Sequence, residues 1–256
     1  MHKNSFFDPI ENLIVYQLIA QLADNGGEDF TFIEVGAFDG TTANHIHPHA
    51  TNRGWKGLVI EPSPPAFSKL KLAYAGHPQV IVVQTAVGDK SGIVPFYWVE
   101  PDKELDWIDM MSSTDKAVIL AQKSLVPNIA ERIKELEVPI RTISDLCTEH
   151  HLARVDLIKI DAEGHDDDVL RSIDFKKIKP VMIMFEHKLI PTERLHANDE
   201  MLTSFGYERI PMWADTVYVT GGFARDECVM RIIASAPSLW PVGRDPTWGN
   251  GNWFAN

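Results

Sequence analysis

Cysteine is scarce in this sequence, which has only two among 256 residues. Cys147 and Cys228 stand far apart and lack the spacing of a metal site, which excludes a disulfide framework and indicates a reducing compartment. Long hydrophobic runs are also missing, so no segment reads as a membrane span. The N-terminal stretch has no basic region followed by a long apolar core, as a signal peptide would. We therefore expect a soluble, cytoplasmic protein without a membrane partner.

Basic residues are outnumbered, with 24 Lys and Arg against 36 Asp and Glu and a net charge of -12. Nucleic-acid binding needs clustered Lys and Arg side chains, so this balance argues against a nucleic-acid partner. The rest of the composition, with 45% apolar and 23% charged residues, is ordinary for a globular protein. A chain of this length can bury a full core in one large domain.

Short apolar stretches alternate with helix-like stretches from residue 30 onward. Strands are predicted at 31–35, 58–60, 80–84, 155–160 and 181–185, and helices between Pro64 and Gly76 and at 144–151, 165–173 and 195–205. This alternation predicts an α/β fold with a doubly wound, mostly parallel sheet. The stretches 207–212 and 216–221 predict a hairpin that places an antiparallel pair at one edge of the sheet.

No repeat or linker divides the chain, and a single domain over residues 1–256 is expected. Its parts are an N-terminal amphipathic helix in 1–29, a core over 30–221 and a C-terminal extension over 222–256. Residues 100–137, between strand candidates 93–99 and 138–143, are either an insertion on the ligand side or a packing helix. The extension carries tryptophans that either stack on a sugar or anchor a strap, namely Trp240, Trp248 and Trp253.

The segment "EVGAFDG" at 34–40 follows the first predicted strand, at the sheet edge where α/β proteins bind ligands. Gly36 and Gly40 allow the backbone to approach a ligand, and a helix expected after them offers N–H groups to an anion. A dinucleotide site has three glycines, but Phe38 stands here and Glu34 would repel a pyrophosphate. The cationic groups of S-adenosylmethionine suit this loop better. A tight turn with two surface acids is the alternative.

Glu61 ends the second predicted strand, where a carboxylate can accept hydrogen bonds from both hydroxyls of a ribose. The same edge carries the third strand's "TAVGD" and the fourth strand's "KIDAEGHD". The histidines of "HIHPH", His45, His47 and His49, fall in a region expected to be helical and are interpreted as surface residues.

Together with "FIEVGAFDGTTANHI", "MFEHK" and above all "GWKGLVIEP" and "KIDAEGHD", these segments resemble the FkbM family of S-adenosylmethionine-dependent methyltransferases over roughly residues 30–210. The resemblance implies a class I, Rossmann-like fold and methylation of a hydroxyl on a sugar, a glycoconjugate or another small metabolite. One departure is Phe38, which stands where the family often has Asn.

The resemblance also implies a set of cofactor-binding residues. Those in the glycine loop would line the methionine end of S-adenosylmethionine, Glu61 would bind its ribose, and the residues after the second and third strands would border its adenine. The full set is Glu34, Gly36, Ala37, Asp39, Gly40, Asn44, Glu61, Pro62, Ser63, Ala86, Val87 and Asp161.

A hydroxyl acceptor must lose its proton as it attacks, which calls for a general base or a Lewis acid. The catalytic candidates at the strand ends are Asp161, His165, Glu186 and His187. In one hypothesis His165 or His187 is the base. In another, Asp161, Glu186 and His187 converge on Mg²⁺ or Mn²⁺, since oxygen ligands with one imidazole suit these ions.

Several neighbouring residues have structural explanations as well. Lys159, inside the fourth strand, is predicted to pair with a carboxylate, and Asp166–Asp168 suit the N-terminus of a helix. Ser112, Ser113 and Thr114 either hydrogen-bond a polar acceptor or cap a helix.

Two rival functions are weighed against methyl transfer. A nicotinamide-dependent oxidoreductase shares the architecture but is disfavoured by Phe38 and the missing third glycine. A methyltransferase-like binding protein without turnover is the other.

Overall fold

The computed structural model describes residues 9–27, 29–102, 105, 107–212 and 215–239. These residues form a central seven-stranded sheet in the order β10-β11-β9-β8-β1-β2-β3. The strands in chain order are β1 (Thr31–Val35), β2 (Lys56–Ile60), β3 (Val80–Val83), β8 (Leu157–Ile160), β9 (Met182–Glu186), β10 (Tyr207–Pro211) and β11 (Asp215–Thr220). Strands β3, β2, β1, β8 and β9 run parallel, whereas β11 is antiparallel to both β9 and β10. The predicted doubly wound sheet and its antiparallel edge hairpin are confirmed.

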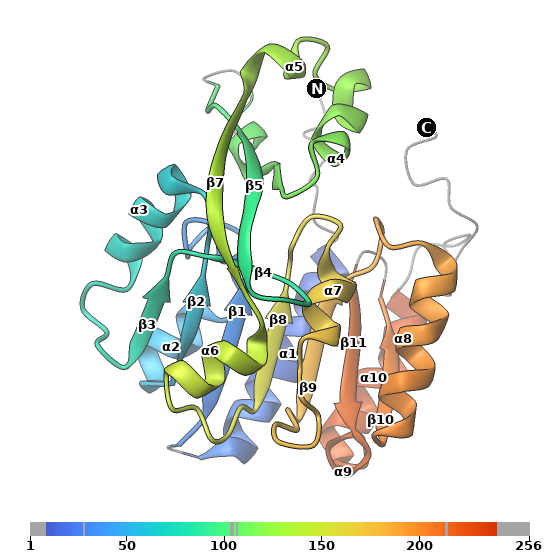
Figure 1. The fold of residues 1–256 in the computed structure, drawn as a ribbon. Helices are drawn as coiled ribbons and strands as arrows, with labels where there is room; N and C mark the ends of the chain where they lie inside the picture. The colour runs from blue at the N-terminus through green and yellow to red at the C-terminus, as the bar shows by residue number, and fades with distance from the viewer. Residues whose placement is uncertain (1–8, 28, 103–104, 106, 213–214, 240–256) are drawn as a thin grey trace.

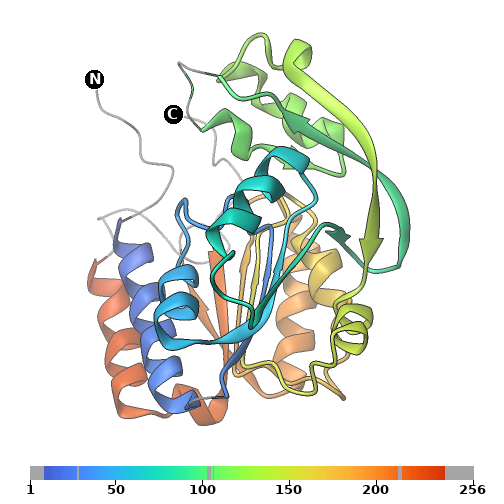
Figure 2. The ribbon, with the colours of Figure 1, turned by 90° about the vertical axis from the view of Figure 1, so that its left-hand side faces the viewer.

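Helices cover both faces of the sheet (Figure 1, Figure 2). One face packs against α6 (Ile143–Glu149), α7 (Asp166–Arg171) and α8 (Thr192–Ser204), and the other against α1 (Pro9–Gly26), α2 (His47–Arg53), α3 (Pro64–Ala73) and α10 (Glu227–Leu239). Successive strand residues serve opposite faces, so Ile33 and Val35 enter one core while Phe32 enters the other. Because both faces are covered, β1 and β8 are buried throughout, as their apolar runs predicted.

A lobe formed by the described residues of 92–141 rises beyond the carboxyl ends of the sheet (Figure 1). Its two long strands, β5 (Gly92–Val99) and β7 (Ile133–Arg141), pair antiparallel along their whole length. Between or beside them lie β4 (Ala86–Val87), η1 (Ile108–Met110), β6 (Ser112–Ser113), α4 (Lys116–Leu120), η2 (Ala121–Ser124) and α5 (Ile129–Arg132). The predicted insertion is therefore on the ligand side, and the strand expected at 138–143 instead begins at Ile133 and ends at Arg141.

The helix expected directly after Gly40 is not there. Residues 41–46 form turns, and α2 begins at His47. The Oδ1 atom of Asn44 accepts hydrogen bonds from the N–H groups of Ile46 and His47, at 2.8 and 2.7 Å. The prediction that a helix N-terminus at this loop faces an anionic ligand was therefore wrong, because Asn44 already satisfies those donors.

The histidines His45 and His49 are buried, contrary to the expectation that they lie on the surface. The Nε2 atom of His45 lies 2.7 Å from Oδ1 of Asn12 in α1, and His49 stacks on Trp55 with ring centroids 5.1 Å apart. Burial lowers the pKa of both imidazoles, that of His45 to about 4. They act as neutral packing groups between α1, α2 and the sheet.

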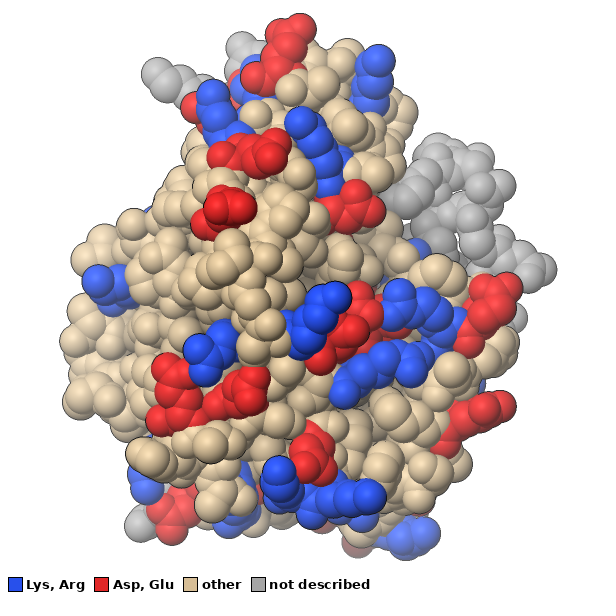
Figure 3. Space-filling view, in the orientation of Figure 1, with Lys and Arg blue, Asp and Glu red and all other residues tan. Residues whose placement is uncertain are grey.

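The C-terminal extension begins with α9 (Gly221–Ala224) and α10, which packs beside α1 (Figure 2). Trp240, Trp248 and Trp253 lie outside the described residues. Within the described part of the chain, no helix combines the length and the apolar character that crossing a membrane requires. On the face shown in Figure 3, basic and acidic side chains are interspersed.

An ion pair between Glu34 and Lys159 is buried where β1 and β8 lie side by side. The Nζ atom of Lys159 is 3.2 Å from Oε1 of Glu34, and the two side chains are 11% and 0% exposed. Burial alone would lower the pKa of Lys159, but Glu34, Asp161 and Asp215 outweigh that effect and raise the pKa above its ordinary value. Asn44 donates to both carboxylate oxygens of Glu34, each at 3.0 Å. The prediction that Lys159 pairs with a carboxylate is confirmed.

Replacing Lys159 with methionine should destabilise the protein by roughly 3–5 kcal/mol, because Glu34 would be left as a buried charge without its counter-ion. The double variant Lys159→Met/Glu34→Gln should recover most of that loss. The exposed pair Arg231–Glu227, with side chains 77% and 76% exposed, is the control, and Arg231→Met should change stability by less than about 1 kcal/mol. Urea denaturation measures all three, and equal losses in Lys159→Met and Arg231→Met would contradict the expectation.

Candidate functional site

A hollow lies between the carboxyl ends of the strands and the lobe. Strand order reverses between β1 and β8, because the chain first adds β2 and β3 on one side and later β8 and β9 on the other. Ligands of open α/β sheets bind at such a switch point. The residues that line the hollow are Val35, Gly36, Glu61, Pro62, Thr85, Ala86, Val87, Phe96, Ser112, Ser113, Thr114, Asp161, Ala162, Glu163 and His165.

Gly36 lies at the topological switch point, close against the backbone at the end of β8. Its φ is 71°, and a Cβ atom at this position would lie 1.8 Å from the carbonyl oxygen of Asp161. The N–H groups of Gly36 and Ala37 both donate to the carbonyl of Ile60, each at 3.0 Å. The chain can therefore pass between the ends of β2 and β8 only with a glycine here.

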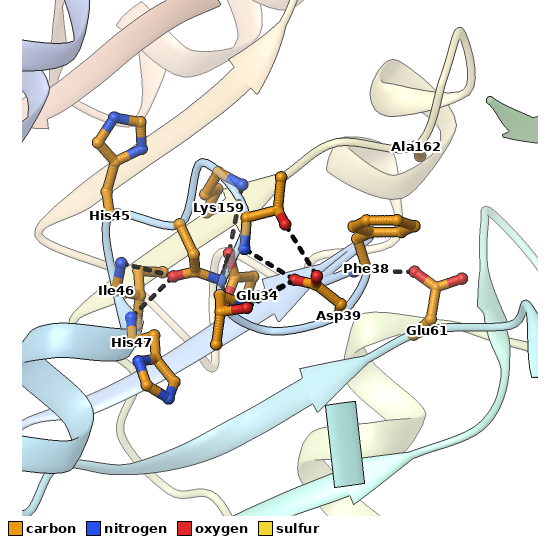
Figure 4. A network of polar contacts seen from close by, with 12 residues as sticks. Glu34, Phe38, Asp39, His45, Ile46, His47, Glu61, Lys159 and Ala162 are labelled. Carbon is orange, nitrogen blue, oxygen red and sulfur yellow. Dashed lines mark hydrogen bonds and ion pairs between the residues drawn. The ribbon is translucent and has the colours of Figure 1, made fainter. Parts of the chain in front are cut away.

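Glu61 is buried at the edge of the hollow, with its side chain toward the glycine loop (Figure 4). Its Oε1 accepts from the backbone N–H of Ser63 at 2.8 Å, and its Oε2 from that of Phe38 at 3.0 Å. Burial raises the pKa of Glu61 to about 7, the two backbone donors oppose that rise, and the charge of Asp161 adds to it. This carboxylate therefore changes its charge near neutral pH and keeps lone pairs for further donors.

The structure divides the predicted cofactor-binding residues into two groups. Gly36, Glu61, Pro62, Ala86, Val87 and Asp161 line the hollow. The others contribute to the loop and its support. Ser63 reaches Glu61 with its N–H group, Ala37 lies in the core, and Gly40 packs against Leu70, Ala73 and Tyr74 around the end of α3.

Glu34, Asp39 and Asn44 hold the loop together through hydrogen bonds, and Figure 4 labels the first two of them. Asp39 accepts hydrogen bonds from the N–H and hydroxyl groups of Thr41 and Thr42. Burial raises the pKa of Asp39, but these hydrogen bonds outweigh burial and leave the pKa below its ordinary value. Glu34 is enclosed by Lys159 and Asn44 and does not line the hollow. The predicted contacts of Glu34, Asp39 and Asn44 with a cofactor stay predictions.

The two predicted general bases differ in position. His165 lines the hollow immediately before α7, with its Nδ1 atom 3.3 Å from Oδ2 of Asp168. Its Nε2 atom is enclosed and has no hydrogen-bond partner among the described residues. His187 is 5% exposed, its Nδ1 atom lies 2.9 Å from the hydroxyl of Thr216 in β11, and burial lowers its pKa to about 4. His187 does not line the hollow, which favours His165.

Carboxyl groups gather behind the end of β8. Burial and the charge of Asp161 raise the pKa of Glu186 to about 7, while Lys188 at 3.4 Å opposes the rise. Burial and then Glu186 raise the pKa of Glu163 well above its ordinary value. Glu186 therefore exchanges its proton near neutral pH, and Glu163 holds its proton to a higher pH than an ordinary glutamate.

The predicted convergence of Asp161, Glu186 and His187 on a metal ion is not found. Among the described residues, no three His, Cys, Asp or Glu side chains are arranged to hold a metal. The reason is that His187 turns toward Thr216 and away from the hollow, while Glu186 is paired with Lys188.

Several lining residues were not identified from the sequence. Phe96 lies in β5, and Thr85 donates from its hydroxyl to the carbonyl of Pro139 in β7. Both reach the hollow because the lobe folds back over the sheet, which no local pattern encodes. Ser112–Thr114 were identified as candidates, and Ser113 donates from its hydroxyl to the carbonyl of Glu163, at 3.1 Å.

The sheet order, with β11 antiparallel between β9 and β10 among the described strands, and the hollow at the switch point define a doubly wound, Rossmann-like α/β fold. The profile of the methyltransferase FkbM domain matches residues 34–209, and the chain belongs to this family.

Among curated relatives, "Methyltransferase 1" of Beauveria bassiana (strain ARSEF 2860) is 26% identical over 179 residues, covering 68% of this chain and 66% of that protein. The chain thus spans just under two thirds of that relative's length. Among solved structures, methyltransferase FkbM from Methylobacillus flagellatus KT is 15% identical with a TM-score of 0.47, over 75% of this chain and 44% of that one. A precorrin-6y C5,15-methyltransferase from Geobacter metallireducens GS-15 is 10% identical with a TM-score of 0.43, over 86% and 92% of the two chains.

Replacing Gly36 with alanine should cost at least about 3 kcal/mol or prevent folding, because the new Cβ would strike a backbone oxygen in addition to straining φ. Gly54 is the matched control, since it has a similar φ of 69° with nothing within 4 Å of its Cβ position. Gly54→Ala should cost only about 1–2 kcal/mol, the penalty of the left-handed backbone alone. Thermal and urea unfolding of both variants test the difference, and equal costs would refute the steric explanation.

Proposed function

We propose that this protein is an S-adenosylmethionine-dependent methyltransferase that methylates a hydroxyl on a sugar, a glycoconjugate or another small polar metabolite. The observation that carries the proposal is the meeting of Gly36, Glu61 and Asp161 around the hollow at the switch point of an FkbM-family chain. The scarcity of cysteine supports a cytoplasmic location, and the acidic net charge favours a small molecule over a nucleic acid as the acceptor.

The residues present fit S-adenosylmethionine in two respects. Gly36 lines the hollow, and its positive φ turns the loop backbone past the end of β8. Glu61 and Asp161 offer acceptors and negative charge, which suit ribose hydroxyls and the cationic groups of the cofactor. No Lys or Arg stands among the described residues that line the hollow, so a pyrophosphate has no counter-charge there.

When bound, S-adenosylmethionine supplies a methyl group on a positively charged sulfur, so that a C–O bond to the acceptor forms as the C–S bond breaks and its electron pair stays on sulfur. The protein's tasks are to align the acceptor and to remove its proton. His165 lines the hollow and has an enclosed Nε2 atom without a partner among the described residues, so it is the proposed base.

The lobe is the proposed source of acceptor specificity. Ser112, Ser113 and Thr114 line the hollow together with Glu163, whose pKa burial and the charge of Glu186 raise above its ordinary value. Such groups donate and accept hydrogen bonds without a fixed positive charge, a chemistry that suits a polyhydroxylated acceptor and disfavours an anionic one.

S-adenosylmethionine should bind about tenfold more weakly at pH 6 than at pH 8. The ribose hydroxyls would donate to the ionised Glu61 carboxylate, and its pKa of about 7 in the free protein means that lowering the pH protonates it before binding. Isothermal titration measures the affinities, with NADH as the parallel ligand.

Glu61→Gln is the control for that titration and should bind weakly with no dependence on pH over this range. Unchanged affinity in this variant would exclude Glu61 as a ribose ligand. Binding of NADH in place of S-adenosylmethionine would overturn the proposed function itself.

His165→Gln should lower kcat for methyl transfer by roughly 10²–10⁴, the usual contribution of a general base, while leaving S-adenosylmethionine affinity unchanged. His187→Gln is the matched control and should keep kcat within a few-fold if the protein remains folded. Transfer of a labelled methyl group to a panel of hydroxylated acceptors provides the assay. A kcat loss confined to His187→Gln would assign the base to the other imidazole.

A further inference from the structure

His165 is held by a chain of charged groups that leads away from the hollow to the outer face of the molecule. His165 is the residue before α7, and Asp168 lies in the first turn of that helix. The imidazole is fixed at Nδ1, since that atom lies 3.3 Å from Oδ2 of Asp168. The opposite ring nitrogen, Nε2, is the enclosed atom without a partner among the described residues.

Asp168 is bound on its other oxygen by the guanidinium of Arg194, which comes from the neighbouring helix α8. Burial raises the pKa of Asp168, but the hydrogen bonds of Arg194 and then His165 outweigh burial and leave the pKa below its ordinary value. Asp168 is therefore ionised at neutral pH and faces a ring nitrogen of His165. An ionised carboxylate can only accept, so Nδ1 carries the hydrogen in this contact.

Arg194 is itself anchored by a second carboxylate. Its Nε atom contacts Oδ2 of Asp167, a side chain that is 1% exposed. A guanidinium with two carboxylate partners presents its donors in a fixed plane, which limits the positions that Asp168 can take. Arg171 lies 3.9 Å from the same Asp167 oxygen and donates a hydrogen bond to Asn198. These contacts of Arg171 do not include Asp168.

The other carboxyl groups near His165 are less suited to take a proton from a hydroxyl. Burial and the charges of Glu186, Asp161 and Asp166 raise the pKa of Glu163 well above its ordinary value, so Glu163 ionises less readily than an ordinary glutamate. Asp166 accepts from the N–H groups of Ala162 and Gly164, both at 3.3 Å, and so supports the turn that carries His165. Among the described residues that line the hollow, His165 is the imidazole, and a carboxylate contacts its far nitrogen.

We propose that Asp168 and Arg194 are positioning residues for methyl transfer: Asp168 holds His165 in the tautomer with hydrogen on Nδ1, and Arg194 holds Asp168. The inference rests on the proposed function. As the acceptor oxygen forms its bond to the methyl carbon and the C–S bond breaks, the hydroxyl proton passes to Nε2. The resulting imidazolium is stabilised by the Asp168 carboxylate and later returns its proton to water.

The experiment that tests this inference has a readout independent of turnover. Nitrogen-15 NMR of the histidine rings in the full chain distinguishes hydrogen on Nδ1 from hydrogen on Nε2, with His165→Gln identifying the signals. In the unsubstituted protein we expect His165 to carry hydrogen on Nδ1. Asp168→Asn should shift the population toward the other tautomer, and Arg194→Gln should shift it less, with Arg194→Lys nearer to the unsubstituted protein.

The same variants should separate kcat from binding. Asp168→Asn should lower kcat by about 10²-fold or more, with S-adenosylmethionine affinity within about twofold of the unsubstituted protein. Arg171→Gln is the matched control, because Arg171 shares the helix and the ion-pair group but contacts neither His165 nor Asp168. It should leave the His165 tautomer unchanged.

The outcomes separate this inference from the proposed function. A tautomer change in Asp168→Asn alone supports the positioning role even if no acceptor is methylated, in which case only the proposed function fails. Active unsubstituted protein with no change of tautomer or kcat in Asp168→Asn would overturn the positioning role. Equal effects of Arg171→Gln and Asp168→Asn would overturn it too, since they would show a general structural role for the ion-pair group.

Discussion

The close approach of β1 to β8 at Gly36 is the constraint on which the site depends. With only 1.8 Å between a notional Cβ and the Asp161 carbonyl oxygen, the loop after β1 must turn at this point with a positive φ. That turn sends the Phe38 N–H to Glu61 and leaves the end of β8 open to the hollow. The positions of Glu61 and Asp161 relative to each other therefore follow from a contact in which no side chain takes part.

The polar groups around the glycine loop hold its shape without any ligand. Glu34 is bound by Lys159 and Asn44, and Asp39 by the two threonines that follow it. Fixing these groups during folding means that a ligand need not order the loop when it binds, so less binding free energy is lost to ordering. The acids that a sequence pattern suggests as ligands of the cofactor serve here first to preorganise the backbone.

Apolar runs were enough to predict the sheet, its hairpin and the edge that carries the site, because parallel strands end on the same side. It was harder to predict which acidic side chains face the hollow. Side chains alternate along β1, so Ile33 and Val35 lie on one face of the sheet and Glu34 on the other, and this distinction is present in the sequence. No local sequence pattern shows which of the two histidines lies at the hollow. The position of His165 depends on Asp168 from α7, and that of His187 on Thr216 from β11.

The lobe contacts the core at two places, and in the proposed function it would select what enters the hollow. At the first, Lys69 of α3 lies over the Phe38 ring and pairs with Asp109 of η1 at 3.3 Å, while at the second Ser113 bonds the carbonyl of Glu163. Glu163 has a φ of 47°, a strained backbone that the Ser113 contact helps to hold. β7 also pairs with β4, whose Ala86 and Val87 line the hollow together with Gly36 and Glu61. The lobe and this wall of the hollow therefore belong to one second sheet, and a change in β7 is transmitted to the residues beside Glu61.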